Sequence, residues 1–213
     1  MTRYINKTLT CSVCGKNHEY NVLSSFSVFE SYLDGYTGKP EIYEFILECP
    51  YCHNVAESIT TEISEKEKNY ILSDEYQKAF RDDRDRYVRR FVETAKRKEA
   101  VGQWLAAAHY WLMASWRAYD LDDSQESDYQ NKAVSSYKNA LIDDEPVQME
   151  HLCVMVDLLR QLNRFEEAEY YAESCMVVYE KENATDEDEY AVLKQEMKLI
   201  RDKDCSRHTY GGE

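Results

Sequence analysis

The first 63 or so residues alternate between apolar and polar positions with the period of two that is typical of β-strands. Segments rich in Tyr, Phe, Val and Ile predict three strands, at His18 to Leu23, Phe26 to Leu33 and Glu41 to Leu47. The turn formers Asp34-Gly35 and Thr37 to Pro40 separate the last two. A sheet this small buries too little apolar surface to be stable alone, so it requires a further cross-link.

Beyond residue 63 the apolar period changes to that of a helix. Ser64 and Glu67 have the form of a capping box, and Ser73 offers a second helix start. Large apolar side chains then recur at helical intervals, at Tyr76, Phe80, Tyr87, Phe91 and Ala95. This spacing predicts a long amphipathic helix that connects the N-terminal unit to the rest of the chain.

From Val101 onward almost no Gly or Pro interrupts the helical pattern, and a repeat is visible. Ala133 and Ala168 occupy the same repeat position, where antiparallel helices of a tetratricopeptide-like unit approach closely only if side chains are short. The helices of two such units are expected around residues 111–118, 133–141, 152–159 and 171–176. Asp186 to Lys203 is expected to form a capping helix, and Cys205 to Glu213 a frayed tail.

These patterns predict an α+β protein that is mostly α. A small N-terminal β zinc ribbon would occupy residues 1–63, and an Arg-rich amphipathic connecting helix or helices residues 64–100. A tetratricopeptide-like helical-repeat domain with its capping helix would occupy residues 101–204, and a tail residues 205–213. Since 43% of the 213 residues are hydrophobic, the chain can build a substantial core.

The ribbon assignment rests on two Cys-x-x-Cys pairs, Cys11 with Cys14 and Cys49 with Cys52, which 34 residues separate. Two intervening residues let one tight turn offer both sulfurs to one ion, and Zn²⁺ accepts four thiolates tetrahedrally. This spacing therefore predicts a closed, structural zinc site with an inserted β-hairpin between its halves. The alternatives are a redox-active or incidental pair, or replacement of one thiolate by His18 or His53.

Charge is distributed unevenly along the chain. The net charge of −15 argues against general binding of polyanions, yet residues 77–100 hold nine basic and five acidic residues. Candidate phosphate contacts on this segment are Arg84, Arg86, Arg89 and Arg90. The alternative is a solvated helix face whose arginines pair with Asp82, Asp83 and Asp85 or with the neighbouring acidic domain.

The remaining cysteines, Cys153, Cys175 and Cys205, have no partner at metal-binding spacing and are expected to be small buried or tail residues. The N-terminal residues show no apolar signal core, and no apolar run approaches the roughly 18 residues of a membrane helix. We therefore expect reduced thiols, a cytoplasmic location and no membrane association.

The two cysteine pairs, the stretch Pro40 to Cys52 and the helical-repeat tail together resemble the bacterial DUF2225 family of uncharacterised proteins. The resemblance implies a four-cysteine zinc ribbon followed by tetratricopeptide-like helices, and it implies no activity. The chain departs from the family pattern at Ser12, where Pro is expected, and at His53 to Ala56, where Gly-Tyr-Ala is expected. His53 thus stands where Gly would allow a left-handed turn.

Stacked helical pairs favour a non-enzymatic adaptor that binds a protein partner. Candidate contact residues are Trp111, Tyr119, Tyr137, Tyr170 and Tyr171, with core packing as the alternative role. Binding of nucleic acid through the ribbon and the Arg-rich segment is the alternative function, and self-association through the ribbon stays open. The chain has no phosphate-binding Gly-rich loop or Gly-x-Ser-x-Gly elbow, and His109 and His151 have no matching triad, so no enzymatic activity is expected.

Overall fold

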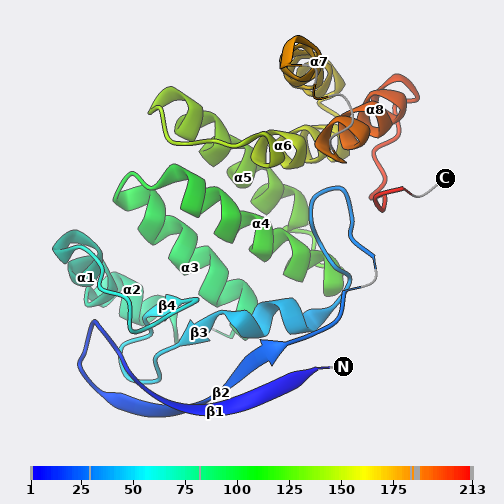
Figure 1. Cartoon of the computed structure of the whole chain (residues 1–213). Helices are drawn as coiled ribbons and strands as arrows, with labels where there is room; N and C mark the ends of the chain where they lie inside the picture. The colour runs from blue at the N-terminus through cyan, green and yellow to red at the C-terminus, as the bar shows by residue number, and fades with distance from the viewer. Residues whose placement is uncertain (1, 29, 82, 183, 185–187, 212–213) are drawn as a thin grey trace.

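The computed structural model describes residues 2–28, 30–81, 83–182, 184 and 188–211 (Figure 1). Two small antiparallel hairpins, which carry four clustered cysteines, precede a domain of packed helices. This arrangement confirms the predicted α+β class with a mostly helical second part. A single hydrophobic core runs from the cysteines into the helices.

Each hairpin carries one cysteine pair at its turn. Strand β1 (Arg3–Thr10) pairs with β2 (Asn17–Ser25), and β3 (Leu47–Glu48) pairs with β4 (Val55–Ala56). Strand β1 is not among the three strands predicted from the sequence. Its side chains are almost all exposed, so it lacks the apolar content that identifies a buried strand.

Two of the predicted strands are wrong. Phe26 to Leu33 forms no strand within its described residues, apart from an isolated bridge between Tyr32 and Thr209, and Phe29 lies outside them. Most of Glu41 to Leu47 is the 3₁₀ helix η1 (Pro40–Phe45), which Pro40 favours as its first residue. The expected inserted hairpin is therefore a loop followed by a helical turn.

The insert, residues 26–46, is rich in apolar residues because it packs on the helical domain, not because it forms a sheet. Tyr36 and Tyr43 are buried, and their hydroxyls both donate to the carboxylate of Asp120 in helix α4 (Trp104–Asp120). The contacts that order the insert thus lie about 80 residues away in sequence, at separations of 84 and 77. Contacts of this kind do not produce the alternation of apolar and polar residues from which strands are predicted.

The connecting segment forms three helices. They are α1 (Glu65–Ile71), α2 (Asp74–Ala79) and α3 (Arg86–Ala100). The predicted starts at Ser64 and Ser73 are confirmed, because each hydroxyl accepts the backbone N–H three residues later. The single long helix is wrong: Asp85 accepts the N–H groups of Tyr87 and Val88, so a new helix begins at Arg86.

The remaining helices form an antiparallel array. After α4 come α5 (Glu126–Ile142), α6 (Met149–Gln161), α7 (Phe165–Glu182) and α8 (Asp188–Arg201). Ala133 and Ala168 are fully buried, as the close approach of paired helices requires. The predicted start of the capping helix at Asp186 lies outside the described residues. Helix α8 packs on both α6 and α7 and so covers the end of the array (Figure 1).

The C-terminal segment is not frayed over residues 205–211. Arg207 is nearly buried and binds the carboxylates of Asp34 in the insert and Glu126 in α5. Leu33 and Tyr210 add backbone hydrogen bonds between the insert and the tail. The tail is therefore a structural element that lies beside the insert (Figure 1). Among the described helices, none has both the length and the apolar character to span a membrane.

Candidate metal centre

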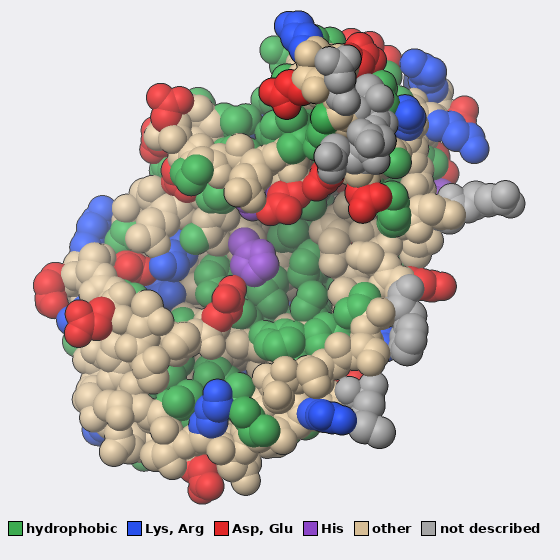
Figure 2. Space-filling view, viewed as in Figure 1, with side chains coloured by type: hydrophobic (Ala, Val, Ile, Leu, Met, Phe, Trp, Pro, Cys, Tyr) green, Lys and Arg blue, Asp and Glu red, His purple; other side chains and the backbone are tan. Residues whose placement is uncertain are grey.

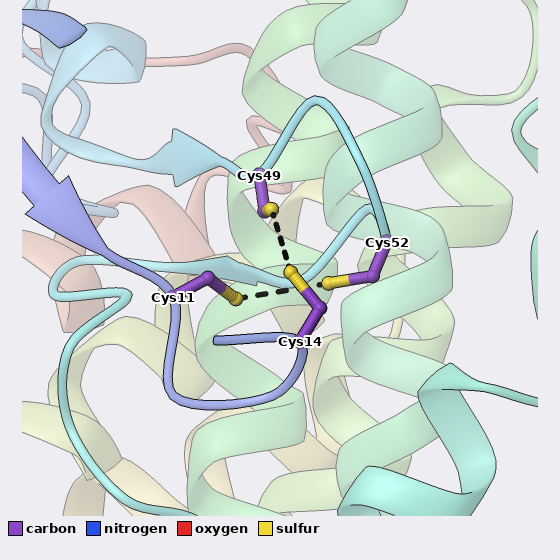
Figure 3. A group of neighbouring side chains, drawn as sticks. All are labelled: Cys11, Cys14, Cys49 and Cys52. Atoms are coloured by element: carbon purple, nitrogen blue, oxygen red, sulfur yellow. Dashed lines mark hydrogen bonds between the residues drawn. The ribbon is translucent and has the colours of Figure 1, made fainter. Parts of the chain in front are cut away.

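The four cysteines from the two hairpin turns point toward one another (Figure 3). Their sulfur atoms all lie within 4.8 Å of one another, with 3.7 Å between Cys11 and Cys52 and 3.7 Å between Cys14 and Cys49. These distances exclude a disulfide, whose sulfurs are about 2.05 Å apart. They match a zinc tetrahedron, since Zn–S bonds of about 2.3 Å give sulfur–sulfur edges of about 3.8 Å.

Both hairpin turns have the same backbone form. Gly15 and His53 follow the two knuckles with φ angles of 68° and 56°, in the left-handed region. Their N–H groups donate to the carbonyls of Cys11 and Cys49, at 2.9 Å in each case. His53 therefore adopts the conformation that normally favours glycine, and the geometry of the second knuckle is kept.

The ring of His53 has its own partners. Its Nδ1 lies 2.7 Å from a carboxylate oxygen of Glu48, and the ring stacks on Phe80 with 4.6 Å between centroids. His18 lies edge-on against the rings of Tyr20 and Tyr51. Neither histidine belongs to the cluster, so the structure favours the four-thiolate set over a mixed one.

A buried polar layer surrounds the cluster. The side-chain amide of Asn54 lies 3.8 Å from the sulfur of Cys11, and Arg97 in α3 donates to the amide oxygen of Asn54 at 3.1 Å. Arg97 also donates to the carbonyl of Val55 at 3.0 Å, and it is only 1% exposed. Through these two bonds Arg97 orients the second turn, and Asn54 connects it to the sulfur of Cys11.

Arg97 and Asn54 were not singled out by the sequence. Arg97 was one of nine basic residues in its segment, and Asn54 was noted only as part of a departure from the family pattern. Glu67, three residues after the N-cap Ser64 of α1, faces the same guanidinium at 3.7 Å and binds Lys98 at 2.8 Å. The helix cap predicted from the sequence thus also anchors the layer behind the metal site.

The thiols differ in their tendency to ionise. Burial opposes ionisation of Cys11, but the backbone N–H groups of Cys14 and Val13 outweigh it and lower the pKa of this thiol. Burial raises the pKa of Cys49 and of Cys52, and neighbouring thiolates add to the effect at both positions. Cys49 and Cys52 therefore favour the protonated thiol in the absence of a cation, and a metal ion bound here would displace their protons.

The other cysteines lie apart from the cluster. Cys153 and Cys175 are buried in helices α6 and α7, and Cys205 is exposed at the start of the tail. Burial raises the pKa of Cys175 to about 11, so this thiol is neutral at physiological pH. These placements agree with the roles expected for them.

The candidate phosphate contacts take part in interactions inside the protein. Arg84 donates to Glu93 at 3.1 Å, Arg86 to Glu44 at 3.1 Å and Arg90 to Glu48, while Arg89 lies over the ring of Phe80. Glu44 and Glu48 belong to the insert and β3, so these pairs hold the metal-bearing unit against α3. Of the acidic partners expected for this segment, Asp82 lies outside the described residues and Asp85 binds Arg117 in α4.

The five candidate contact aromatics do not form one surface. Trp111 and Tyr137 are buried at 1% and 3% exposure, Tyr171 is half-buried, and Tyr119 and Tyr170 are exposed. Tyr170 and Tyr171 meet edge to face on α7, whereas Tyr119 lies on α4 beside Tyr36. Of the five, only Tyr119, Tyr170 and Tyr171 expose a substantial part of the side chain.

Comparison with known proteins does not extend this picture. No family model, no curated protein and no solved structure matches the chain. The resemblance to the DUF2225 family stays a prediction from the cysteines and the stretch before Cys49. The structure by itself establishes a cluster of four thiols that can hold a metal ion and that fits zinc.

Proposed function

We propose that the protein holds one structural Zn²⁺ ion through Cys11, Cys14, Cys49 and Cys52 and acts as a non-enzymatic adaptor for a protein partner. The observation that carries the metal assignment is the gathering of the four sulfurs within 4.8 Å of one another. Three of these cysteines are buried, and four thiolates fill the coordination of zinc. The site has no open position for a substrate or an activated water, so its role is to cross-link.

The cross-link joins two hairpin turns that belong to separate sheets. Hairpins β1–β2 and β3–β4 form separate two-stranded sheets, and the second has only two residues in each strand. Isolated two-stranded hairpins are marginally stable in water. Zinc would hold the two turns together, and Arg97 would then dock the assembled unit onto α3.

The adaptor assignment is supported by the stacked helices α3 to α8, which form an extended surface for a macromolecule. Exposed aromatics on this array, Tyr119 and Tyr170, suit a contact surface because they combine a large apolar ring with a polar tip. Nucleic-acid binding is less well supported, since three of the four candidate arginines already pair with glutamates.

The metal assignment is tested by replacing Cys49 or Cys11 with Ser and measuring zinc per chain by elemental mass spectrometry. Each replacement is expected to abolish stoichiometric zinc and to melt roughly the first 60 residues while the helices remain, because zinc binding supplies the folding free energy of the unit. Cys205→Ser, an exposed cysteine outside the cluster, is the control and should keep zinc. Full zinc in Cys49→Ser would show that the ligands are assigned wrongly.

The adaptor assignment is tested by recovering the tagged full chain from its own cells, with and without nuclease, and identifying what accompanies it. A protein in near-equal amount that resists nuclease is expected. Tyr170→Ala and Tyr119→Ala then show which exposed aromatic contributes, with Leu72→Ala as an exposed control on the segment before α3. Recovery that disappears with nuclease, or weakens steeply between low and moderate salt, would instead support phosphate contacts.

A further inference from the structure

A hollow of about 570 Å³ opens between the helical array and the metal-bearing unit. Its wall is formed by α4, the end of α5, the start of α6 and the residue that follows β4. Figure 2 shows this face hollowed beside a histidine, with apolar surface on the floor. The volume lies in the range of small-ligand and side-chain pockets.

Two tyrosines on the floor have no partner for their hydroxyl groups. Tyr110 is 7% exposed and Tyr137 is 3% exposed, and neither hydroxyl makes a hydrogen bond to any residue that the structure describes. The hydroxyl oxygens are not sealed in, because neither is among the fully enclosed atoms that lack a partner. Burial raises the pKa of Tyr110 to about 12, so the phenol keeps its proton. Neither hydroxyl therefore has a partner within the described residues, and each can bond water or a ligand group.

Two histidines complete an aromatic wall. His109 directly precedes Tyr110 in α4, and the ring centroid of His151 lies 6.2 Å from that of Tyr137. The Nδ1 atom of His151 accepts the backbone N–H of Gln148 at 3.0 Å. The wall therefore carries four π faces.

The charge at the rim is negative. Glu57 is exposed beside the hollow, whereas Glu145, at the connection between α5 and α6, accepts the backbone N–H groups of Trp104 and Leu105 at 2.6 and 2.9 Å. The single cation of the rim, Lys98, donates to Glu67 at 2.8 Å and to Gln103 at 2.6 Å, so acidic and amide groups already match its charge. Together with the net charge of −15, this arrangement attracts cations and repels anions.

We propose that this hollow receives an arginine side chain of the protein partner. A planar guanidinium stacks on tyrosine and histidine rings and offers five N–H donors, which Glu57 and the phenol oxygen of Tyr110 can accept. A carboxylate would be repelled by Glu57, and a purely apolar side chain would displace water from the Tyr110 hydroxyl without replacing its hydrogen bond. The proposal rests on the adaptor function and names the chemistry that the partner presents.

The test uses the full, zinc-loaded chain and the capped peptide acetyl-Gly-Arg-Gly-amide, observed by the NMR shifts of the histidine ring protons. Citrulline in place of arginine removes the charge at constant shape. We expect saturable shifts of His109 and His151 with the arginine peptide and at least tenfold weaker binding of the citrulline peptide. Equal binding of both peptides, or no shift at high peptide concentration, would overturn the proposal.

Two variants locate the binding. Glu57→Gln removes the rim charge at an exposed position, and Tyr137→Phe removes one hydroxyl and keeps the ring. Each is expected to weaken arginine binding severalfold, while Glu173→Gln, an exposed site on α7 outside the hollow, leaves it unchanged. Zinc content and helical circular dichroism verify folding, and Glu57→Gln alone decides the matter if Tyr137→Phe unfolds. Unchanged binding in Glu57→Gln counts against the proposal.

Recovery of the partner from cells with the tagged variants distinguishes failure of the arginine site from failure of the adaptor function. If the partner is recovered equally by Glu57→Gln and by the unaltered chain, the hollow is not its arginine site and the adaptor function stands. If the arginine peptide binds in the hollow and no protein partner is recovered, the recognition of arginine stands and the adaptor function fails.

Discussion

The guanidinium of Arg97 connects the metal centre to the helical array. It is buried, yet it donates to Asn54 and to the carbonyl of Val55 and faces Glu67. A buried charge is tolerated only where several partners replace water, and here they come from the second knuckle and from α1. One side chain thus joins the turn that carries Cys49 and Cys52, the first helix and α3.

We predict that Arg97→Leu lowers the free energy of unfolding by about 3 kcal/mol, because it leaves two buried oxygens without donors and Glu67 with Lys98 alone. The variant should also lose zinc faster to a chelator, since the turn beside Cys52 is no longer held. Urea unfolding and a colorimetric zinc-release assay measure the two effects.

The matched control for Arg97 is Arg86→Ala in the same helix. The side chain of Arg86 is 55% exposed and pairs with Glu44, so its removal should cost less than about 1 kcal/mol. Equal destabilisation by the two substitutions would mean that Arg97 has no special role at the metal centre.

Among the elements, the break between α2 and α3 shows how a local cap and a distant partner act together. The carboxylate of Asp85 accepts two backbone N–H groups of α3 and also the guanidinium of Arg117 in α4, at 3.1 and 2.9 Å. The apolar spacing across this break is still helical, so periodicity predicted one helix. The pairing with Arg117, 32 residues away, directs α3 along α4.

We predict that Asp85→Ala destabilises the protein by about 2 kcal/mol and that Asp85→Asn costs less, because Asn still caps the helix but does not pair with Arg117. Thermal unfolding of both variants beside the unaltered chain measures the difference. Equal losses for Ala and Asn would contradict a capping role.

The ion pair at Asp85 also predicts a pH dependence. Partial burial disfavours the charge of Asp85, but hydrogen bonds from Arg117 and from the α3 backbone prevail and lower its pKa. Because the pKa in the folded state lies below the unfolded value, the stabilisation is present above about pH 4 and lost as the pH falls further. The advantage of the unaltered chain over Asp85→Asn should therefore shrink below about pH 4 in urea unfolding experiments, and a constant difference would contradict this assignment.

In the molecule as a whole, the insert and the C-terminal tail meet across the helical array. Asp34 is fully buried and accepts from Trp116 in α4, from the backbone of Tyr36 and from Arg207 in the tail. Arg160 in α6 donates to the carbonyls of Asp204 and Ser206, both at 2.7 Å. The two segments thus order each other, although neither forms regular secondary structure at the contact.

We predict that Arg207→Ala lowers the free energy of unfolding by about 3 kcal/mol, because it leaves the carboxylate of Asp34 buried without its charge partner. Hydrogen exchange should quicken at the amides of Leu33 and Tyr210, which bond the two segments. Lys198→Ala, at an exposed position of α8, serves as the control and should leave both measurements unchanged. Rapid exchange of these amides already in the unaltered chain would show that the tail is loose.

The sequence by itself determined the features that depend on neighbours within a few residues. The two Cys-x-x-Cys turns, the caps at Ser64 and Ser73 and the small residues Ala133 and Ala168 were all recognised because their chemistry is local. The succession of helices after residue 63 was predicted for the same reason, from the local spacing of apolar residues. These features were enough to predict the four thiols and the fold class.

Only the tertiary structure decided which distant groups meet. Arg97 and Asn54 are 43 residues apart, and Arg207 and Asp34 are 173 residues apart. Partners at such separations are chosen by the packing of whole elements, which no local pattern encodes. For this reason the docked tail, the helical turn in the insert and the tyrosine-floored hollow became visible only in the folded chain.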